Sequence, residues 1–325
     1  MRSIVSFRDI KGQDKALLFL KRSIASDRVA HAYIFLGPRG VGKFSTALNF
    51  AKALNCLNGI DHEPCESCLS CKKIKSSNHP DLFSVKLEKD ASSIKIDRIR
   101  ELIKDIGLKP YEGRKKVYII DSADCMTQES SNALLKTLEE PPSDSVLILI
   151  AENLGSLFQT IVSRSQVVRF FALKPEVVSQ ILVKDYSLED EKAHVLAHLS
   201  SGRLGEALTY AEPKFFDKRS AVIDALANKT FFDSDLDGVP KEDLRLYLDI
   251  MLTWYRDILI AKTGSGDAVL INIDRKEAIY SEAKSLTREY LLSAINNIIQ
   301  TSSFLDQNAN QKLAMSVLGL NIGNH

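Results

Sequence analysis

A phosphate-binding loop constrains the fold of this sequence more than any other feature. Residues Gly37–Ser45 read GPRGVGKFS, between an apolar strand-like run at Ala32–Leu36 and a helix-like run over 45–54. A G-x-x-x-x-G-K-[ST] loop in this setting wraps backbone N–H groups around phosphates at a helix N-terminus, while its lysine reaches the terminal phosphates. The pattern predicts a nucleotide site built from Gly37, Gly40, Gly42, Lys43 and Ser45.

One position of this loop departs from the pattern. The hydroxyl after the lysine normally binds Mg²⁺, but here the residue is Phe44, which has no oxygen. The acidic strand Val117–Asp121 (VYIID) ends in a carboxylate that could face the metal. Ser122 then stands where an active enzyme usually carries the acid that positions water. We therefore expect a degenerate site, with Asp121 as a member, that lacks Mg-dependent hydrolysis. Whether ATP or ADP still binds stays open.

The order of apolar and helical patterns predicts an α/β fold followed by helices. Strand-like runs alternate with helical patterns through the first ~170 residues, which favours a parallel sheet flanked by helices. Strand signals nearly end after Phe170–Lys174, short helical patterns fill 175–212, and the chain is helical from about 213. The predicted strands are Ala32–Leu36, Leu82–Leu87, Val117–Asp121 and Val146–Ala151, and the predicted helices of this part are 45–54, 94–106 and 128–140.

Two later segments show helical stripes that we expect to pack in a core or against another subunit. The first lies within 244–260 and the second within 288–305. The stripes comprise Leu244, Leu248, Met251, Tyr255, Ile258 and Leu259 in the first segment, and Leu291, Ile295, Ile298, Ser302 and Leu305 in the second.

Four of the five cysteines form a metal-binding pattern. Cys56, Cys65, Cys68 and Cys71 give C-x8-C-x2-C-x2-C, and four thiolates complete the closed tetrahedral shell of a structural zinc ion. His62 is an alternative ligand in place of one thiolate.

Composition limits the remaining function classes. At 325 residues we expect two or three domains. The net charge of +1 gives no general attraction to nucleic acid. No apolar run approaches the ~20 residues of a membrane span, and the N-terminus lacks the apolar segment of a secretory signal. Clustered cysteines suit a reducing compartment, so we expect a cytoplasmic protein that does not contact membranes.

The order of several motifs resembles one family. After the phosphate loop and the cysteines come His79-Pro80-Asp81, then Asn132–Pro142 (NALLKTLEEPP), then Thr160–Gln166 (TIVSRSQ). This series resembles the bacterial clamp-loader AAA+ subunits of DNA polymerase III. Phe7–Gln13 (FRDIKGQ) resembles the family's N-terminal box, and Asn308–Leu313 (NANQKL) resembles the end of its helical collar domain.

The resemblance implies a domain plan and partners. It implies an AAA+ P-loop domain over residues 1–172 with a zinc insertion at 56–71, a helical lid over 173–212, and an all-α collar over 213–325. The collar would join gamma/tau and delta subunits in a hetero-oligomer that acts on the sliding clamp and primed DNA in replication. The chain would thus be part of the DNA polymerase III holoenzyme, a DNA-directed DNA polymerase.

Within this family the chain resembles the delta-prime type. The gamma/tau motor subunits keep a full P-loop, a Walker B acidic pair and a nucleotide-sensing lid arginine. Here those places hold Phe44, Ser122 and Gly205, with Arg203 near the last. The string Trp254–Asp257 (WYRD) also resembles delta-prime. The resemblance implies a subunit that helps load the clamp and has little or no ATPase activity of its own.

The resemblance also assigns a role to one arginine. Ser163-Arg164-Ser165 matches the family's Ser-Arg-Cys motif, with serine in place of cysteine. Arg164 would act as an arginine finger that reaches the ATP site of the neighbouring motor subunit. Without that context, an ordinary surface ion pair is the alternative.

Two other functions remain alternatives. The chain could be an active gamma/tau-like ATPase in which Ser45 or Thr46 replaces the missing hydroxyl. It could also be a free-standing zinc protein that binds nucleic acid, with Arg114-Lys115-Lys116 as a basic contact, although the near-neutral charge disfavours this.

Overall fold

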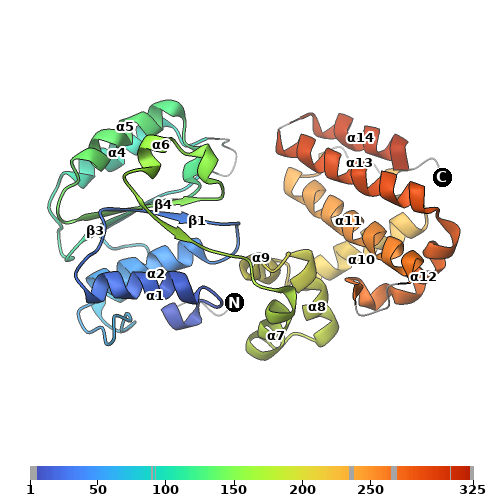
Figure 1. Cartoon of the computed structure of the whole chain (residues 1–325), viewed down its shortest axis with the longest axis horizontal. Coiled ribbons are helices and arrows are strands. Elements are labelled where there is room, and N and C mark those ends of the chain that lie inside the picture. Colours follow the sequence, from blue (N-terminus) through green and yellow to red (C-terminus); the bar gives the residue numbers. More distant parts are fainter. Residues whose placement is uncertain are drawn as a thin grey trace. The chain divides into compact units, whose positions relative to one another are not determined.

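The computed structural model describes residues 6–88, 91, 93–233, 238–264, 269–307 and 309–322. The chain divides into two compact units (Figure 1). The first contains Met1–Leu173 with Arg203–Gly205, and the second contains Lys174–Gly202 with Glu206–His325. The division into P-loop, lid and collar domains remains a prediction, and Asn308 of the NANQKL motif lies outside the described residues.

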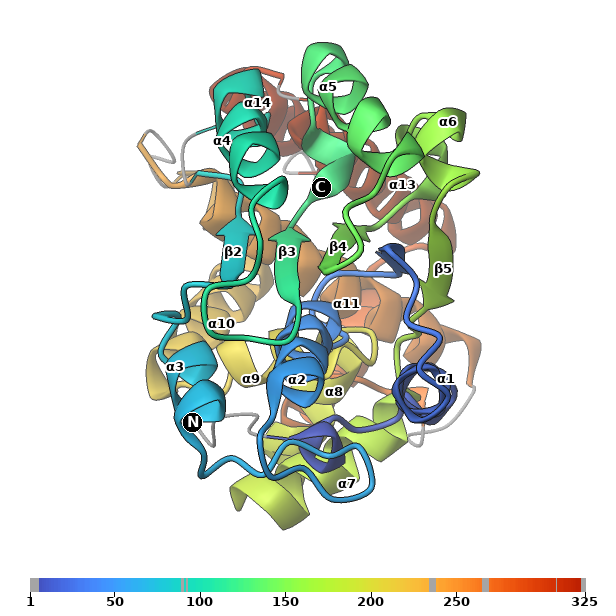
Figure 2. The ribbon, with the colours of Figure 1, turned by 90° about the vertical axis from the view of Figure 1, so that its left-hand side faces the viewer.

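A five-stranded parallel sheet forms the centre of the first unit, as the alternating pattern predicted. The strand order is β2-β3-β4-β1-β5, and every neighbouring pair is parallel. Because the strands are parallel, the loops after them meet at one edge (Figure 2). The strands are β1 (Ala32–Leu36), β2 (Leu82–Val85), β3 (Lys116–Ile120), β4 (Ser145–Ala151) and β5 (Gln166–Arg169).

The bounds of β3 and β4 differ from the prediction by one residue, and larger differences occur in β2 and β5. Strand β2 ends at Val85, two residues before the predicted end at Leu87. Strand β5 was not among the predicted runs, because its sequence QVVR is short and begins and ends with a polar residue. It pairs with β1 on the side away from β4.

Helices cover both faces of this sheet, which explains its continuous apolar strands. Tyr33 and Phe35 of β1 pack in the layer of α1 and α2, whereas Ile34 and Leu36 pack in the layer of α4, α5 and α6. The helices of this unit are α1 (Asp14–Ala25), α2 (Lys43–Asn55), α3 (Leu69–Lys75), α4 (Ile96–Ile106), α5 (Gln128–Glu139) and α6 (Gln159–Val162).

The second unit is helical throughout its described part. Short 3-10 helices occur in both units at Phe7–Asp9, Ala123–Cys125, Leu154–Ser156, Phe231–Asp233 and Ile273–Arg275. Within the described ranges, every helix is too short or too polar to span a lipid bilayer. The helices are α7 (Pro175–Tyr186), α8 (Asp190–Leu199), α9 (Leu204–Thr209, which begins in the first unit), α10 (Pro213–Ala227), α11 (Lys241–Thr263), α12 (Lys276–Ser285), α13 (Arg288–Asp306) and α14 (Gln311–Ile322).

The predicted stripes of α11 and α13 are largely buried, and the two helices pack together. In α11 the stripe is buried except for Leu259, which is half-buried, and Trp254 and Asp257 are buried as well. In α13, Ile295 and Ser302 are only half-buried. Helix α11 therefore buries more of its circumference than one stripe, because several helices surround it.

A buried carboxylate positions the loop that leads into β3. Asp81, which is 2% exposed, lies just before β2. Its oxygens accept hydrogen bonds from the backbone N–H groups of Tyr111, Glu112 and Gly113 at 2.7, 2.8 and 2.6 Å. Burial alone would raise the pKa of Asp81, but these three hydrogen bonds outweigh it and hold the pKa below its usual value.

The last residue of α2 continues this anchor. The Asn55 side-chain oxygen accepts from the N–H groups of Arg114 and Lys115 at 2.8 and 3.0 Å, and its amide donates to Lys115 O at 3.0 Å. Residues 111–115 are thus held from both β2 and α2, and this sets where β3 begins.

Asp81→Asn should destabilise the protein by roughly 2–4 kcal/mol, because an amide leaves buried N–H donors without an acceptor. Since the folded-state pKa is depressed, the Asp81 contribution is present above the unfolded value of about 3.9 and is lost as pH falls through the folded value. Denaturant melts of wild type and variant should therefore converge at acidic pH.

The matched control is Asp144→Asn, because the Asp144 side chain is 51% exposed and pairs with Lys115 at 3.4 Å. A surface pair contributes about 0–1 kcal/mol. Equal losses for the two variants at neutral pH would contradict the special role of Asp81.

Candidate functional site

The phosphate loop has backbone conformations that require glycine. Gly37, Gly40 and Gly42 have φ angles of 152°, 74° and 98°. A Cβ atom on Gly37 would lie 2.3 Å from the carbonyl oxygen of Phe170. This distance is a steric clash with the backbone, so only glycine fits at position 37. Gly42 is the N-cap of α2, so the helix begins at Lys43. The loop is thus built at a helix N-terminus, as the sequence predicted.

The loop lysine lies inside the loop. Lys43 is buried, and its Nζ donates to Gly37 O and, at 2.6 Å, to Pro38 O. Burial lowers the pKa of Lys43, while the carboxylates of Glu152, Asp121 and Asp124 act in the opposite direction. Loop carbonyls therefore hold the ammonium, and three carboxylates are close enough to favour its charge.

The residues after Lys43 do not fit a magnesium ion. Phe44 is half-buried and packs against the hydrophobic core of the α1–α2 layer. The Nζ atom of Lys86 lies 4.0 Å from the centre of its ring. Thr46 is fully buried and donates its hydroxyl to Gly42 O at 2.8 Å, so its oxygen serves the helix. An aromatic ring and an ammonium stand where Mg²⁺ needs oxygen ligands.

The acidic side of the site comes from the ends of β3 and β4. Burial raises the pKa of Asp121, and the positive charges of Lys86, Lys43 and Arg39 oppose this shift. Glu152 follows β4 and pairs with Arg39 at 3.5 Å. Ser122, which replaces the second Walker B acid, adopts a left-handed backbone with φ of 62°.

Gly205 approaches the phosphate loop closely. Its N–H donates to Gly40 O at 2.7 Å, within the first unit. A Cβ atom at position 205 would lie 2.7 Å from the same oxygen. Any side chain here would force the two backbones apart, which gives a physical reason for glycine at this position.

The four predicted cysteines come together at the end of α2 and the start of α3. The sulfur atoms of Cys56, Cys65, Cys68 and Cys71 all lie within 4.8 Å of one another, and they are the one group of this kind among the described residues. Backbone N–H groups of Cys65 and Cys68 donate to Cys56 Sγ and Cys65 Sγ, each at 3.3 Å. The arrangement can hold a metal ion in a closed shell. His62 is exposed and outside the group.

Polar contacts tie this cysteine insertion to the rest of the unit. Lys52 of α2 is buried and contacts Glu66 at 3.0 Å, and Lys21 of α1 pairs with Glu63. Ser70 Oγ lies 3.1 Å from His79 Nε2, two residues before the Asp81 anchor. The His-Pro-Asp motif therefore connects the insertion to the sheet.

Arg164 lies just after α6 and forms an ion pair within the chain. Its Nη2 lies 3.0 Å from Glu139 Oε1, its Nη1 donates to Thr160 O at 3.1 Å, and its side chain is 36% exposed. The surface ion pair named above as the alternative is thus present. A surface pair contributes about 0–1 kcal/mol, so releasing the guanidinium costs little.

A buried polar network in the second unit was not foreseen. Arg219 binds Asp274 with two hydrogen bonds of 2.7 and 2.8 Å and donates to Asn272 Oδ1 at 2.7 Å. Asp257 is fully buried and accepts from Ile271 N and from Asn272 N and Nδ2 at 2.7–2.9 Å. The one part of this network that the sequence analysis had noted was Asp257, the last residue of the WYRD string. Its role is to anchor the loop before α12.

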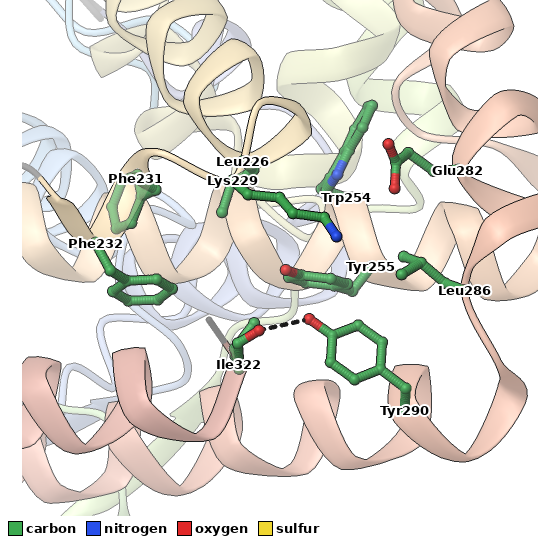
Figure 3. A pocket seen from close by; sticks show the side chains of 10 residues that line it. All are labelled: Leu226, Lys229, Phe231, Phe232, Trp254, Tyr255, Glu282, Leu286, Tyr290 and Ile322. Atoms are coloured by element: carbon green, nitrogen blue, oxygen red, sulfur yellow. Dashed lines mark hydrogen bonds between the residues drawn. The ribbon is translucent and has the colours of Figure 1, made fainter. Parts of the chain in front are cut away.

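An aromatic cavity also lies in the second unit (Figure 3). Its volume is about 30 Å³, room for about one or two waters, and Tyr290 donates to Ile322 O at 2.8 Å on its edge. It is too small for a nucleotide. The lining residues are Leu226, Lys229, Phe231, Phe232, Trp254, Tyr255, Glu282, Leu286, Tyr290 and Ile322.

Comparison with known proteins identifies the family. A family model described as "DNA polymerase III, delta subunit" matches residues 12–174, and one described as "DNA polymerase III, delta subunit, C terminal" matches residues 213–322. A Bacillus subtilis protein named DNA polymerase III subunit delta' is 35% identical over 319 residues, which is 95% of each chain. The chain belongs to the family of DNA polymerase III delta-prime subunits.

Tau and gamma subunits are also relatives, over less of their length. A Haemophilus influenzae tau/gamma subunit is 37% identical over 212 residues, which are 64% of this chain and 30% of that protein. The Bacillus subtilis tau subunit is 28% identical over 89% of this chain and 56% of its own length. The parallel P-loop sheet, the four-cysteine insertion and the helical C-terminal region agree with the AAA+ clamp-loader fold that the motifs predicted.

Proposed function

We propose that this chain is the delta-prime subunit of a DNA polymerase III clamp loader, acting in the cytoplasm to help load a sliding clamp on primed DNA. The observation that carries this proposal is the match to a delta-prime relative over 95% of both chains. The degenerate phosphate loop adds independent support, since a subunit that works as a rigid part of an assembly does not need its own hydrolysis.

The proposed partners are gamma/tau and delta subunits. Helices α10–α14 would form the collar that joins them, and residues 173–212 would form the lid. The internal pairing of the basic cluster disfavours the zinc nucleic-acid-binding alternative, because Lys116 is buried against Asp105 at 2.8 Å and Lys115 binds Ser143 O at 2.7 Å.

Within this proposal the chain does not hydrolyse ATP. Phe44 supplies no metal ligand, Ser122 supplies no base, and the Thr46 hydroxyl is bonded to Gly42 O. In the alternative of an active gamma/tau-like ATPase, Ser45 or Thr46 would supply the missing hydroxyl. With Thr46 excluded, only Ser45 remains, which is half-buried and follows Phe44 in α2. Successive helix residues point ~100° apart, so Ser45 does not take the direction of Phe44.

The isolated chain should therefore show negligible steady-state ATPase activity with magnesium, and no further loss in Lys43→Ala. The measurement is phosphate release by purified protein with and without primed DNA. A turnover typical of an AAA+ motor that disappears in Lys43→Ala would instead establish the gamma/tau-like alternative.

We also propose that the cysteine group holds one structural zinc ion. The four sulfurs lie within 4.8 Å of one another, and four thiolates would complete a tetrahedral zinc shell with no position left for a catalytic water. The metal would neutralise thiolates that accept backbone N–H bonds and would connect α2 to α3.

Metal analysis of purified protein should find about one zinc per chain, and Cys68→Ser should lose most of it, because binding free energy in such sites is local folding free energy. Cys125→Ser is the control, since Cys125 lies outside the group. Hydrogen exchange should increase around residues 56–75 in Cys68→Ser while the sheet stays protected. Full zinc occupancy in Cys68→Ser would reject these ligands.

The third proposal concerns Arg164 as an arginine finger in trans. Its guanidinium is partly exposed and held by a surface ion pair to Glu139. On assembly it would exchange that carboxylate for the phosphates bound by a neighbouring motor subunit. Arginine fingers contribute about 10³–10⁵ in rate in GTPases.

Arg164→Ala in a reconstituted loader should leave assembly intact and nearly silence the one motor site that it serves, which lowers clamp- and DNA-stimulated ATP hydrolysis. Glu139→Gln is the matched control, because it removes the same ion pair and keeps the guanidinium. Equal hydrolysis by Arg164→Ala and wild-type complexes would reject the finger, and failure of Arg164→Ala to assemble would make Arg164 structural.

A further inference from the structure

Lys86 lies at the edge of the sheet where the phosphate loop begins. It follows Val85, the last residue of β2, and Val85 O accepts a hydrogen bond from Asp121 N at 2.8 Å. Because β2 and β3 are parallel neighbours, Lys86 and Asp121 leave the sheet side by side at its carboxyl edge.

The Phe44 ring holds the Lys86 ammonium in this place. The distance of 4.0 Å from Nζ to the ring centre is well within the ~6 Å of a cation–π contact. Phe44 also packs against the core of the α1–α2 layer, which restricts the movement of the ring. Phe44 therefore has two effects. It removes the hydroxyl that would bind Mg²⁺, and its ring provides a face that binds the Lys86 ammonium.

The negative charges around the loop oppose phosphate binding unless a nearby cation offsets them. Asp121, Asp124 and Glu152 lie close enough to Lys43 to raise its pKa, and they would repel a phosphate chain. In an ordinary P-loop site, Mg²⁺ offsets this repulsion. Here Lys86 is the positive charge that acts most strongly on the Asp121 carboxylate, the group that would otherwise face the metal.

We propose that the Lys86 ammonium, held over Phe44, takes the place of magnesium, so that this loop binds the phosphate chain of ADP or ATP without a divalent ion. The inference rests on the proposed role as a subunit that does not hydrolyse ATP. A lysine neutralises phosphate charge but does not coordinate phosphate oxygens as Mg²⁺ does in phosphoryl transfer. Nucleotide bound in this way would therefore have a structural role and would not be hydrolysed.

The experiment is calorimetric titration of the full chain with ADP, in magnesium and in EDTA. Wild type should bind equally well in both, within about twofold. Lys86→Met should weaken binding about five- to tenfold in both buffers, as expected for one near-surface charge contact, and Lys86→Arg should restore it. The Lys86 side chain is exposed, so unchanged melting temperatures should confirm that these variants fold.

Lys109→Met is the control, because Lys109 is also exposed but precedes β3, at the opposite end of the strands. ADP binding that requires magnesium, no ADP binding by wild type in either buffer, or equal binding by Lys86→Met and wild type would each overturn the inference. Assembly with clamp-loader subunits is measured separately. A chain that assembles but binds no ADP would overturn this inference alone and leave the proposed function in place.

Discussion

The buried Asp81 carboxylate is the interaction on which both candidate sites depend. It fixes residues 111–113, while Asn55 fixes residues 114–115. Together they set where β3 starts and therefore where Asp121 emerges at the far end. Asn55 also directly precedes Cys56, so the same anchor orients the first cysteine of the metal group. A shift of one residue in β3 would reverse its two faces and move Asp121 away from Lys43.

A single side chain changes the electrostatics of the phosphate loop. A hydroxyl at position 44 would favour a divalent ion, whereas the Phe44 ring favours a monovalent organic cation and excludes oxygen ligands. The consequence reaches beyond α2, because the cation comes from the end of β2. Loss of hydrolysis and retention of a phosphate-binding loop are therefore compatible properties, since binding needs charge and N–H donors whereas hydrolysis also needs positioned water.

The sequence predicted the features that local patterns encode. The apolar runs located β1, β3 and β4, the loop glycines located the start of α2, and the cysteine spacing predicted the metal-binding group. Contacts between distant segments were not predictable: Phe44 and Lys86 are joined only by the sheet order, and Arg219 meets Asp274 across 55 positions. The short strand β5 was missed because its four residues carry little periodicity. The His-Pro-Asp motif was visible, but its role as an anchor required the hydrogen bonds.

Burial separates the two basic groups that the proposals assign to nucleotide chemistry. Lys43 is buried and bonded to loop carbonyls, so it can serve only a ligand that enters its own loop. Arg164 is partly exposed and held by a surface pair, which a phosphate bound by another subunit would displace at a cost of about 1 kcal/mol or less. A bidentate guanidinium–phosphate contact is charge-assisted, so under the proposal it would replace the surface pair once a motor site is adjacent. The chain can thus lack hydrolysis at its own loop and still supply a group for hydrolysis at another.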